Sequence, residues 1–198
     1  MEIFMGSLLA GDNAAVPSPY DFALGGKGLD PSLPGGVSGT LLQAGQCFMV
    51  DMGGNFYGYM GDMSRVFSIG RLPEQAYTAH QTCIEIQEEI AAMAKPGTVC
   101  EDMYNKAIEI VTKAGFADYF MGVDQKAKFI GHGIGLEINE MPVLAPRMKQ
   151  ELEPGMVFAL EPKIVLPGIG PVGIENSWAV TTDGLEKLTL CKEEIIEL

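Results

Sequence analysis

Two acidic residues, Asp51 and Asp62, lie among apolar neighbours in a predicted hairpin at residues 50–67, VDMGGNFYGYMGDMSRVF. Strand-like residues flank a glycine-containing turn, which predicts a pair of antiparallel strands. A hairpin that is symmetric about Phe56 and Tyr57 would place the carboxylates of Asp51 and Asp62 directly opposite each other, where like charges destabilise the strand pair. We therefore expect a positive group between them. A solvated pair on a surface hairpin is the alternative, which the apolar neighbours disfavour.

A second acidic pair is predicted near the C-terminus. Residues 156–165 and 172–180 have the composition of strands and are joined by a turn rich in proline and glycine. Glu161 lies in the first strand and Glu175 in the second, and their midpoint is Gly168, inside the turn. These carboxylates are also expected to face each other across two apolar strands.

Two helices are predicted between the hairpins. The first spans residues 73–95, with Pro73 in its first turn and a Lys-Pro-Gly stop. The second opens with a capping box formed by Thr98 and Glu101 and ends at Gly115. The apolar residues of both helices are expected to pack into the core.

The two histidines lie in different sequence settings. His80 lies inside the first predicted helix among apolar residues, where a structural role is expected. His132 lies in the segment FIGHGIG, and glycines on both sides of a residue allow the close approach of backbone or a ligand. We therefore expect His132 to be a ligand residue.

The acidic composition limits the classes of partner. A formal net charge of -13 argues against nucleic acid and anionic membranes, because both would repel the chain, and it favours cation binding. No run of residues reaches transmembrane length, and the first residues lack the basic stretch of an export signal. The four cysteines have no Cys-x-x-Cys spacing and lie among apolar residues, which predicts buried thiols in a reducing compartment. The expected location is the cytoplasm.

The four carboxylates and His132 together predict a site for two divalent cations. Burying four like charges without metal would cost several kcal/mol for each unpaired ion. Oxygen-rich ligation with one nitrogen suits manganese best and also admits cobalt, iron or zinc. Two-metal sites activate water and polarise a carbonyl, so hydrolysis of an amide is the expected chemistry.

As a set, the motifs resemble those of the pita-bread metallopeptidases, and within them the branch of aminopeptidase P and Xaa-Pro dipeptidase (prolidase). The matching blocks occur in the family order and are VDMGG, GYMGDMSRVF, GHGIGLEINEMP, ALEP and GIEN. The resemblance implies an α+β pita-bread fold, with a curved antiparallel sheet and helices on its outer face. Residues 1–198 would form a single catalytic-type domain, with a loop-rich entry at 1–46 and a metal-site core at 47–198.

The resemblance also implies a role for each ligand. Asp51 would bind one metal ion, His132 and Glu161 would bind the other, and Asp62 and Glu175 would bridge the two. Glu161 would also carry a proton from the attacking water to the departing amine. The implied substrates are short peptides with proline in the second position.

Three positions depart from the family pattern. The histidine that normally precedes the first aspartate is missing from the segment PSPY at residues 17–20, a second histidine is replaced by Asn139, and an arginine is replaced by Gly173. The family histidines hold the substrate and the developing oxyanion, where one donor contributes roughly 2.7–4 kcal/mol. Asn139 can still contact the substrate through a hydrogen bond, but it cannot carry a proton.

The resemblance leaves two functions open. One is a dinuclear-metal exopeptidase acting on Xaa-Pro peptides, and the other is a catalytically impaired pita-bread domain that binds peptides or proteins. A metal-free hydrolase of the creatinase type is a third function, which the five retained ligands disfavour. The chain begins without the helices that usually open the family's domain, so we expect a fragment or a reduced member. A homo-oligomer would then cover the exposed sheet.

Overall fold

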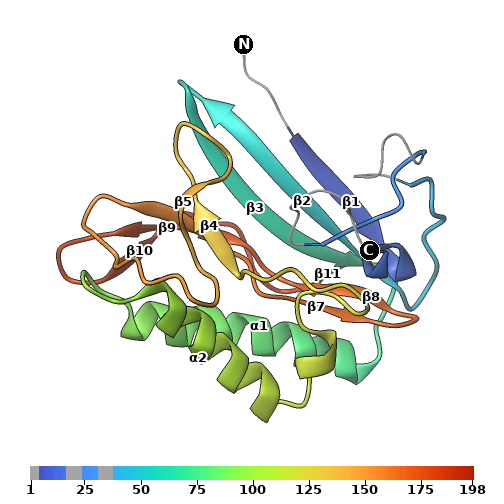
Figure 1. Ribbon diagram of the computed structural model, residues 1–198. Helices are drawn as coiled ribbons and strands as arrows, with labels where there is room; N and C mark the ends of the chain where they lie inside the picture. The colour runs from blue at the N-terminus through green and yellow to red at the C-terminus, as the bar shows by residue number, and fades with distance from the viewer. Residues whose placement is uncertain (1–4, 17–23, 31–37) are drawn as a thin grey trace.

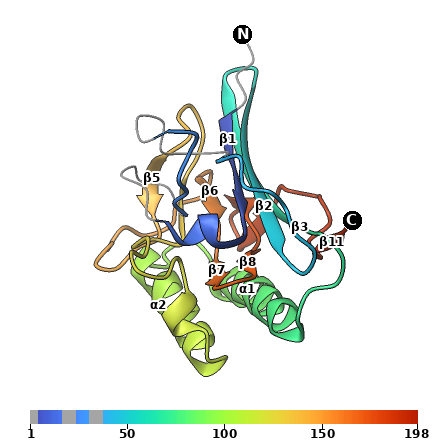
Figure 2. The ribbon, with the colours of Figure 1, turned by 90° about the vertical axis from the view of Figure 1, so that its right-hand side faces the viewer.

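The computed structural model describes residues 5–16, 24–30 and 38–198. It combines antiparallel sheets with two α-helices, as the α+β prediction requires. Helices α1 (Glu74–Met93) and α2 (Cys100–Lys113) lie together along one side of the strands, as Figure 1 shows. In the view of Figure 2, the long strands β1, β2 and β3 rise above these helices.

The described strands form three sheets. The first has the order β1 (Met5–Ala10), β2 (Cys47–Phe56), β3 (Tyr59–Ser68) and β11 (Ile196–Glu197), in which only the β3–β11 pair is parallel. The second has the order β10 (Leu185–Lys187), β9 (Asn176–Val180), β6 (Val157–Leu160), β4 (Gly131–Gly133) and β5 (Glu140–Val143). The third pairs β7 (Lys163–Leu166) with β8 (Gly170–Gly173). Short 3-10 helices, η1 (Gly11–Ala15) and η2 (Ala117–Tyr119), complete the described elements.

Strands β2 and β3 form the predicted hairpin, but the predicted register is wrong. Asp51 pairs with Ser64 rather than with Asp62, so the two aspartates are diagonal neighbours on one face of the hairpin. The reason lies in the turn, because Tyr57 and Gly58 both have positive φ angles, 51° and 89°. Two such residues form the tight turn that matches the twist of paired strands, and they move the hairpin's centre from its expected position.

Both C-terminal strands that were predicted as continuous are interrupted. Glu161 and Pro162 separate β6 from β7, and Glu175 lies between β8 and β9. Proline has no N–H group and cannot continue the ladder of a central strand. The β6–β9 and β7–β8 pairs nevertheless keep one continuous register. Glu161 and Glu175 therefore lie opposite each other at the break, as predicted.

The two predicted helices are confirmed, but their starts differ in detail. Pro73 is the N-cap residue of α1 rather than part of its first turn. The predicted capping box of α2 is wrong, because Val99 is the N-cap residue and no side chain caps it. The hydroxyl of Thr98 accepts a hydrogen bond from the backbone N–H of Lys95, and Glu101 accepts one from the backbone of Arg147. Both side chains are thus engaged elsewhere.

The core lies between helix α1 and the strands that it covers. The buried face of α1 includes Ala79, Cys83, Ile86 and Ile90, and it packs against β7 and β8. All four cysteines are free. Three of them are buried, as predicted, whereas Cys191 is exposed, because it lies in the C-terminal segment beyond β10.

The first 46 residues contain more regular structure than the turns and loop that were predicted. Strand β1 pairs along the whole of its length with β2, and η1 follows it directly. The segment PSPY at residues 17–20 lies outside the described residues.

Candidate metal centre

Five side chains, from β2, β3, β4 and the two strand breaks, converge at the centre of the strands. They form two overlapping groups, and in each group the potential ligand atoms lie within 4.8 Å of one another. The first group consists of Asp62, His132 and Glu175, and the second of Asp51, Glu161 and Glu175. Every residue of the predicted metal set is therefore in one cluster, with Glu175 shared between the two groups. Their role as metal ligands stays a prediction.

His132 faces two of the carboxylates through one ring nitrogen. Its Nε2 atom lies 3.4 Å from Oε1 of Glu161 and 3.8 Å from Oδ2 of Asp62. Its Nδ1 atom lies 3.0 Å from the carbonyl oxygen of Gly133, which can only accept a hydrogen bond. The proton therefore belongs on Nδ1, and Nε2 is left with a lone pair for a cation.

The glycines beside His132 are required by the packing of β4. A Cβ atom on Gly131 would overlap the carbonyl oxygen of Ala159 in β6. A Cβ atom on Gly133 would overlap the backbone of Met141 in β5. The glycine-framed histidine motif is thus explained by the close approach of three strand backbones, which fixes where the imidazole lies.

The structure adds a sixth side chain, Lys163, that was missed in the sequence. Its ammonium lies 2.7 Å from Oε2 of Glu161, 2.9 Å from Oδ2 of Asp51 and 3.3 Å from Oε2 of Glu175. The side chain is completely buried. A lysine two residues after Glu161, inside the apolar run ALEPKIVLP, was the signal that could have revealed it. A positive group was expected between Asp51 and Asp62, whereas the ammonium of Lys163 pairs with Asp51, Glu161 and Glu175.

The centre holds four carboxylates against one ammonium, and this imbalance shifts their proton affinities. Burial, followed by the charges of Asp51 and Glu161, raises the pKa of Asp62 to about 7. Burial and the charge of Glu161 raise the pKa of Glu175 well above its ordinary value. A cation bound here would displace these protons.

Lys163 experiences two opposing effects. Burial lowers the pKa of its ammonium, but the charges of Asp51, Glu161 and Glu175 outweigh that effect and raise the pKa well above its ordinary value. The ammonium form is therefore the state that the surrounding carboxylates stabilise.

The first group fits a divalent ion, whereas the second group is already filled. Asp62, His132 and Glu175 combine carboxylate oxygens with one imidazole nitrogen, a donor set that suits manganese and its neighbours. In the second group, each of the three carboxylates contacts the ammonium of Lys163. The residues present thus fit one metal ion better than the two that were expected.

Helix α1 supports both strand breaks through Gln87. Its amide donates hydrogen bonds to the carbonyl oxygens of Leu160, at 2.6 Å, and Ile174, at 3.3 Å, which directly precede the two glutamates. Its side-chain oxygen accepts a hydrogen bond from Asn176. Neither glutamate belongs to a strand. Gln87 supplies the hydrogen bonds that the backbone carbonyl groups directly before the glutamates need. This residue was not identified from the sequence.

Two further buried side chains fix the backbone around Glu175. The hydroxyl of Ser64 donates to Oε2 of Glu175 at 2.6 Å. The guanidinium of Arg65 donates to the carbonyl oxygens of Ser64 and Glu175 and to the side chain of Asn176. It also donates to the carbonyl oxygens of Cys191 and Lys192, which ties the C-terminal segment to the centre.

His80 has the structural role that was expected. It is buried in α1, where Nδ1 accepts a hydrogen bond from the backbone of Gly173 and Nε2 donates one to the carbonyl oxygen of Glu193. Burial lowers the pKa of this imidazole, which favours the neutral form that both hydrogen bonds require.

A Cβ atom on Gly173 would overlap the carbonyl oxygen of Pro162. No arginine fits in its place.

Asn139 is the predicted substrate contact. It is exposed on the loop between β4 and β5. Its role as a contact for the substrate stays a prediction.

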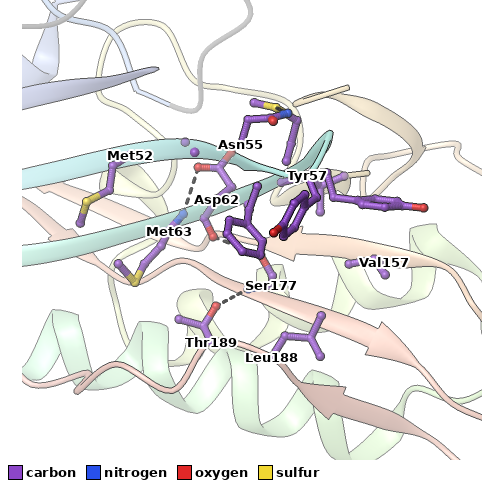
Figure 3. A pocket seen from close by; sticks show the side chains of 16 residues that line it. Met52, Asn55, Tyr57, Asp62, Met63, Val157, Ser177, Leu188 and Thr189 are labelled. Carbon is purple, nitrogen blue, oxygen red and sulfur yellow. Dashed lines mark hydrogen bonds between the residues drawn. The ribbon is translucent and has the colours of Figure 1, made fainter. Parts of the chain in front are cut away.

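A groove with a volume of about 970 Å³ lies beside the centre. Of the five candidate ligands, Asp62 is the one that lines it, and Figure 3 shows Asp62 on the hairpin, near Ser177 of the neighbouring strand. Most of the other lining side chains are apolar, and they include Met52, Phe56, Tyr59, Met63, Val157 and Leu188. The groove thus gives an apolar ligand a surface that ends at a candidate metal ligand.

Comparisons with known proteins identify relatives of the chain. The sequence matches Metallopeptidase family M24 over residues 2–182. It is 30% identical to the Xaa-Pro dipeptidase of Pyrococcus furiosus over 185 residues, which cover 93% of this chain and 51% of the relative. It is 31% identical to the Xaa-Pro dipeptidase of Lactobacillus helveticus over 188 residues, which cover 95% and 45%. The chain spans about half the length of these relatives.

Solved structures have the same fold. The X-Pro aminopeptidase from Thermotoga maritima matches with a TM-score of 0.81 and 26% identity, covering 98% of this chain and 49% of that one. The prolidase from Pyrococcus horikoshii matches with a TM-score of 0.79 and 27% identity, covering 96% and 49%. Both are pita-bread enzymes, which confirms the predicted fold. Within the described ranges, no helix has both the length and the apolar character needed to cross a membrane.

Proposed function

Because the chain belongs to metallopeptidase family M24, we propose that its acidic cluster is the centre of a metal-dependent exopeptidase site. The site would hydrolyse the N-terminal bond of short peptides, with Xaa-Pro peptides as the preferred substrates. The observation that carries this proposal is the convergence of Asp51, Asp62, His132, Glu161 and Glu175, in two groups with donor atoms within 4.8 Å. Relatives named as Xaa-Pro dipeptidases support the choice of substrate.

The metal ion would be held by Asp62, His132 and Glu175, and manganese fits this donor set best, with cobalt, iron and zinc as alternatives. When bound, a divalent ion supplies Lewis acidity that polarises a peptide carbonyl and makes water more acidic. The chain's own contribution is to hold the carboxylates in place. Ser64 and Gln87 do this for Glu175 and for the two strand breaks.

Glu161 is the residue that we expect to move the proton. Its Oε2 atom is held by Lys163 at 2.7 Å, and its Oε1 atom faces His132 at 3.4 Å. A carboxylate fixed at one oxygen and free at the other can take a proton from water and pass it to the departing amine. The adjoining apolar groove supports a peptide as the substrate rather than a highly charged ligand.

The proposal is tested by assaying the purified chain with manganese on Xaa-Pro dipeptides, longer Xaa-Pro peptides and Xaa-Ala counterparts. We expect turnover that a chelator abolishes and that Glu161→Gln lowers about 10²–10⁴-fold, the usual contribution of a general base. Glu151→Gln, at an exposed position, is the matched control. Bound metal without turnover, or turnover that Glu161→Gln leaves unchanged, would contradict the proposal and favour a peptide-binding module.

We also propose that the protein works in the cytoplasm. The four cysteines are all free, and Cys47, Cys83 and Cys100 are buried as thiols, which supports a reducing compartment. Peptides, rather than nucleic acid or membrane, are the partners that the net charge of -13 supports.

A further inference from the structure

We propose that Lys163 takes the place of one of the two metal ions expected in this centre, so that the site binds a single divalent ion beside a built-in ammonium group. The inference rests on the proposed function in assuming that the site binds metal at all. It departs from that function in the number of ions and in the source of the second positive charge.

The first reason for this proposal is the position of the ammonium of Lys163 among the carboxylates of the second ligand group. An ammonium has three N–H donors, and Lys163 has three carboxylate partners, Asp51, Glu161 and Glu175, at 2.9, 2.7 and 3.3 Å. These are the three members of the second ligand group. The ammonium therefore stands where an ion bound by that group would have to stand. Its donors are also fully used.

The second reason is that the side chain of Lys163 is buried and its backbone is held in place. The side chain is 0% exposed, so the ammonium has no exposed surface from which to reach water. The backbone around it is held by pairing with Gly173 and by a hydrogen bond from the N–H of Met121 to the carbonyl oxygen of Lys163. A metal ion would need its ligand oxygens at about 2.0–2.2 Å. The group cannot close around an ion while Nζ remains there.

The third reason is that the ligand atoms of the centre that do not contact Lys163 can bind one metal ion. Glu161 uses Oε2 for Lys163, while its Oε1 lies 3.4 Å from Nε2 of His132. Asp62, His132 and Glu175 form a group of potential ligands that does not include Lys163, although Oε2 of Glu175 also contacts its ammonium. Four carboxylates and one ammonium leave three negative charges, which one divalent ion reduces to one. A second divalent ion is therefore not needed to balance the centre.

The test is the number of manganese ions bound by the purified chain, measured by elemental analysis after dialysis and by electron paramagnetic resonance. We expect one ion per chain with the spectrum of an isolated ion. Lys163→Ala removes the ammonium and opens its position, so we expect two ions per chain with the spectrum of a coupled pair. The control Lys149→Ala removes a lysine from an exposed ion pair with Glu101 and should still bind one ion.

Two coupled ions in the unaltered protein would overturn the inference, whatever its activity. A folded Lys163→Ala variant that still binds one ion would also overturn it. If that variant does not fold, the count for the unaltered protein decides alone. One bound ion without peptide hydrolysis would support the inference while removing the proposed function, and no bound ion would overturn both.

Discussion

Asp62 shows how strongly the centre's charges depend on a bound cation. Burial, Asp51 and Glu161 raise its pKa from 3.8 to about 7, even though Lys163 opposes them. The folded chain without metal therefore holds a proton on this carboxyl at pH values where the unfolded chain has released it. Since the folded state then binds more protons, its stability falls as pH rises from about 4 to about 7.

We accordingly expect the metal-free protein to lose up to about 4 kcal/mol of its free energy of unfolding across this pH range through Asp62. Urea unfolding at a series of pH values measures the loss. Asp62→Asn has no carboxyl to titrate, so its stability should fall less steeply between pH 4 and pH 7. Equal slopes for the two proteins would contradict this account of Asp62.

At the same scale, the sequence predicted the five side chains that form the cluster but not the lysine inside it. Asp51, Asp62 and His132 could be identified because each interrupts an apolar or glycine-rich segment. The ion-pair partners of Lys163 could not be predicted, because they come from β2 and from the two strand breaks. Those contacts form only in the folded chain, where Glu161 and Pro162 interrupt the strand between β6 and β7.

At the scale of elements, Gln87 joins helix α1 to both breaks. Gln87→Ala would leave the buried carbonyl oxygens of Leu160 and Ile174 without their amide donor. We expect a loss of about 2–4 kcal/mol in the free energy of unfolding, because a buried group without a partner costs about 1–3 kcal/mol. Gln81→Ala, at an exposed position of the same helix, should change stability far less. Similar urea midpoints for the two variants would refute the role given to Gln87.

The close approach of β4 to its neighbours gives a second prediction at this scale. Gly133→Ala introduces a Cβ atom that overlaps the backbone of Met141, so β4 must move and carry His132 with it. We expect manganese affinity to fall roughly 10–100-fold, as when the support of a metal ligand is lost. Isothermal titration measures the affinity, with Gly184→Ala as a control whose added Cβ meets only ordinary contacts. Unchanged affinity in Gly133→Ala would show that β4 does not fix the imidazole.

Element boundaries were predictable where proline and glycine mark them. Pro73 and Gly115 place the limits of the two helices within a few residues. The hairpin register was not predictable by symmetry, because the turn is centred on Tyr57 and Gly58 rather than on Phe56 and Tyr57. The predicted capping box was wrong because the side chains of Thr98 and Glu101 accept hydrogen bonds from the backbone of Lys95 and Arg147 instead.

At the scale of the whole molecule, the chain spans about half the length of the relatives it matches and exposes large apolar side chains. Phe56, Tyr57 and Tyr59, at the end of the β2–β3 hairpin, are 67%, 88% and 66% exposed. An exposed cluster of this kind favours association. We predict a homo-oligomer formed through this end of the hairpin.

Sedimentation velocity tests that prediction. The chain should sediment as a species heavier than the 21.2 kDa monomer, and the double substitution Phe56→Ser with Tyr59→Ser should shift it to the monomer. Leu41→Ser, which removes another exposed apolar side chain, should leave the oligomer intact. A single monomeric species for the unaltered chain would rule out association through the hairpin.

One divalent ion and the ammonium of Lys163 are expected to share this acidic centre. Anomalous diffraction from crystals grown with manganese tests it most directly, because each bound ion gives its own peak. We expect one peak between Asp62, His132 and Glu175, with the ammonium of Lys163 still on the carboxylates of Asp51 and Glu161. Two peaks within the cluster, with Lys163 turned away from its carboxylates, would contradict it.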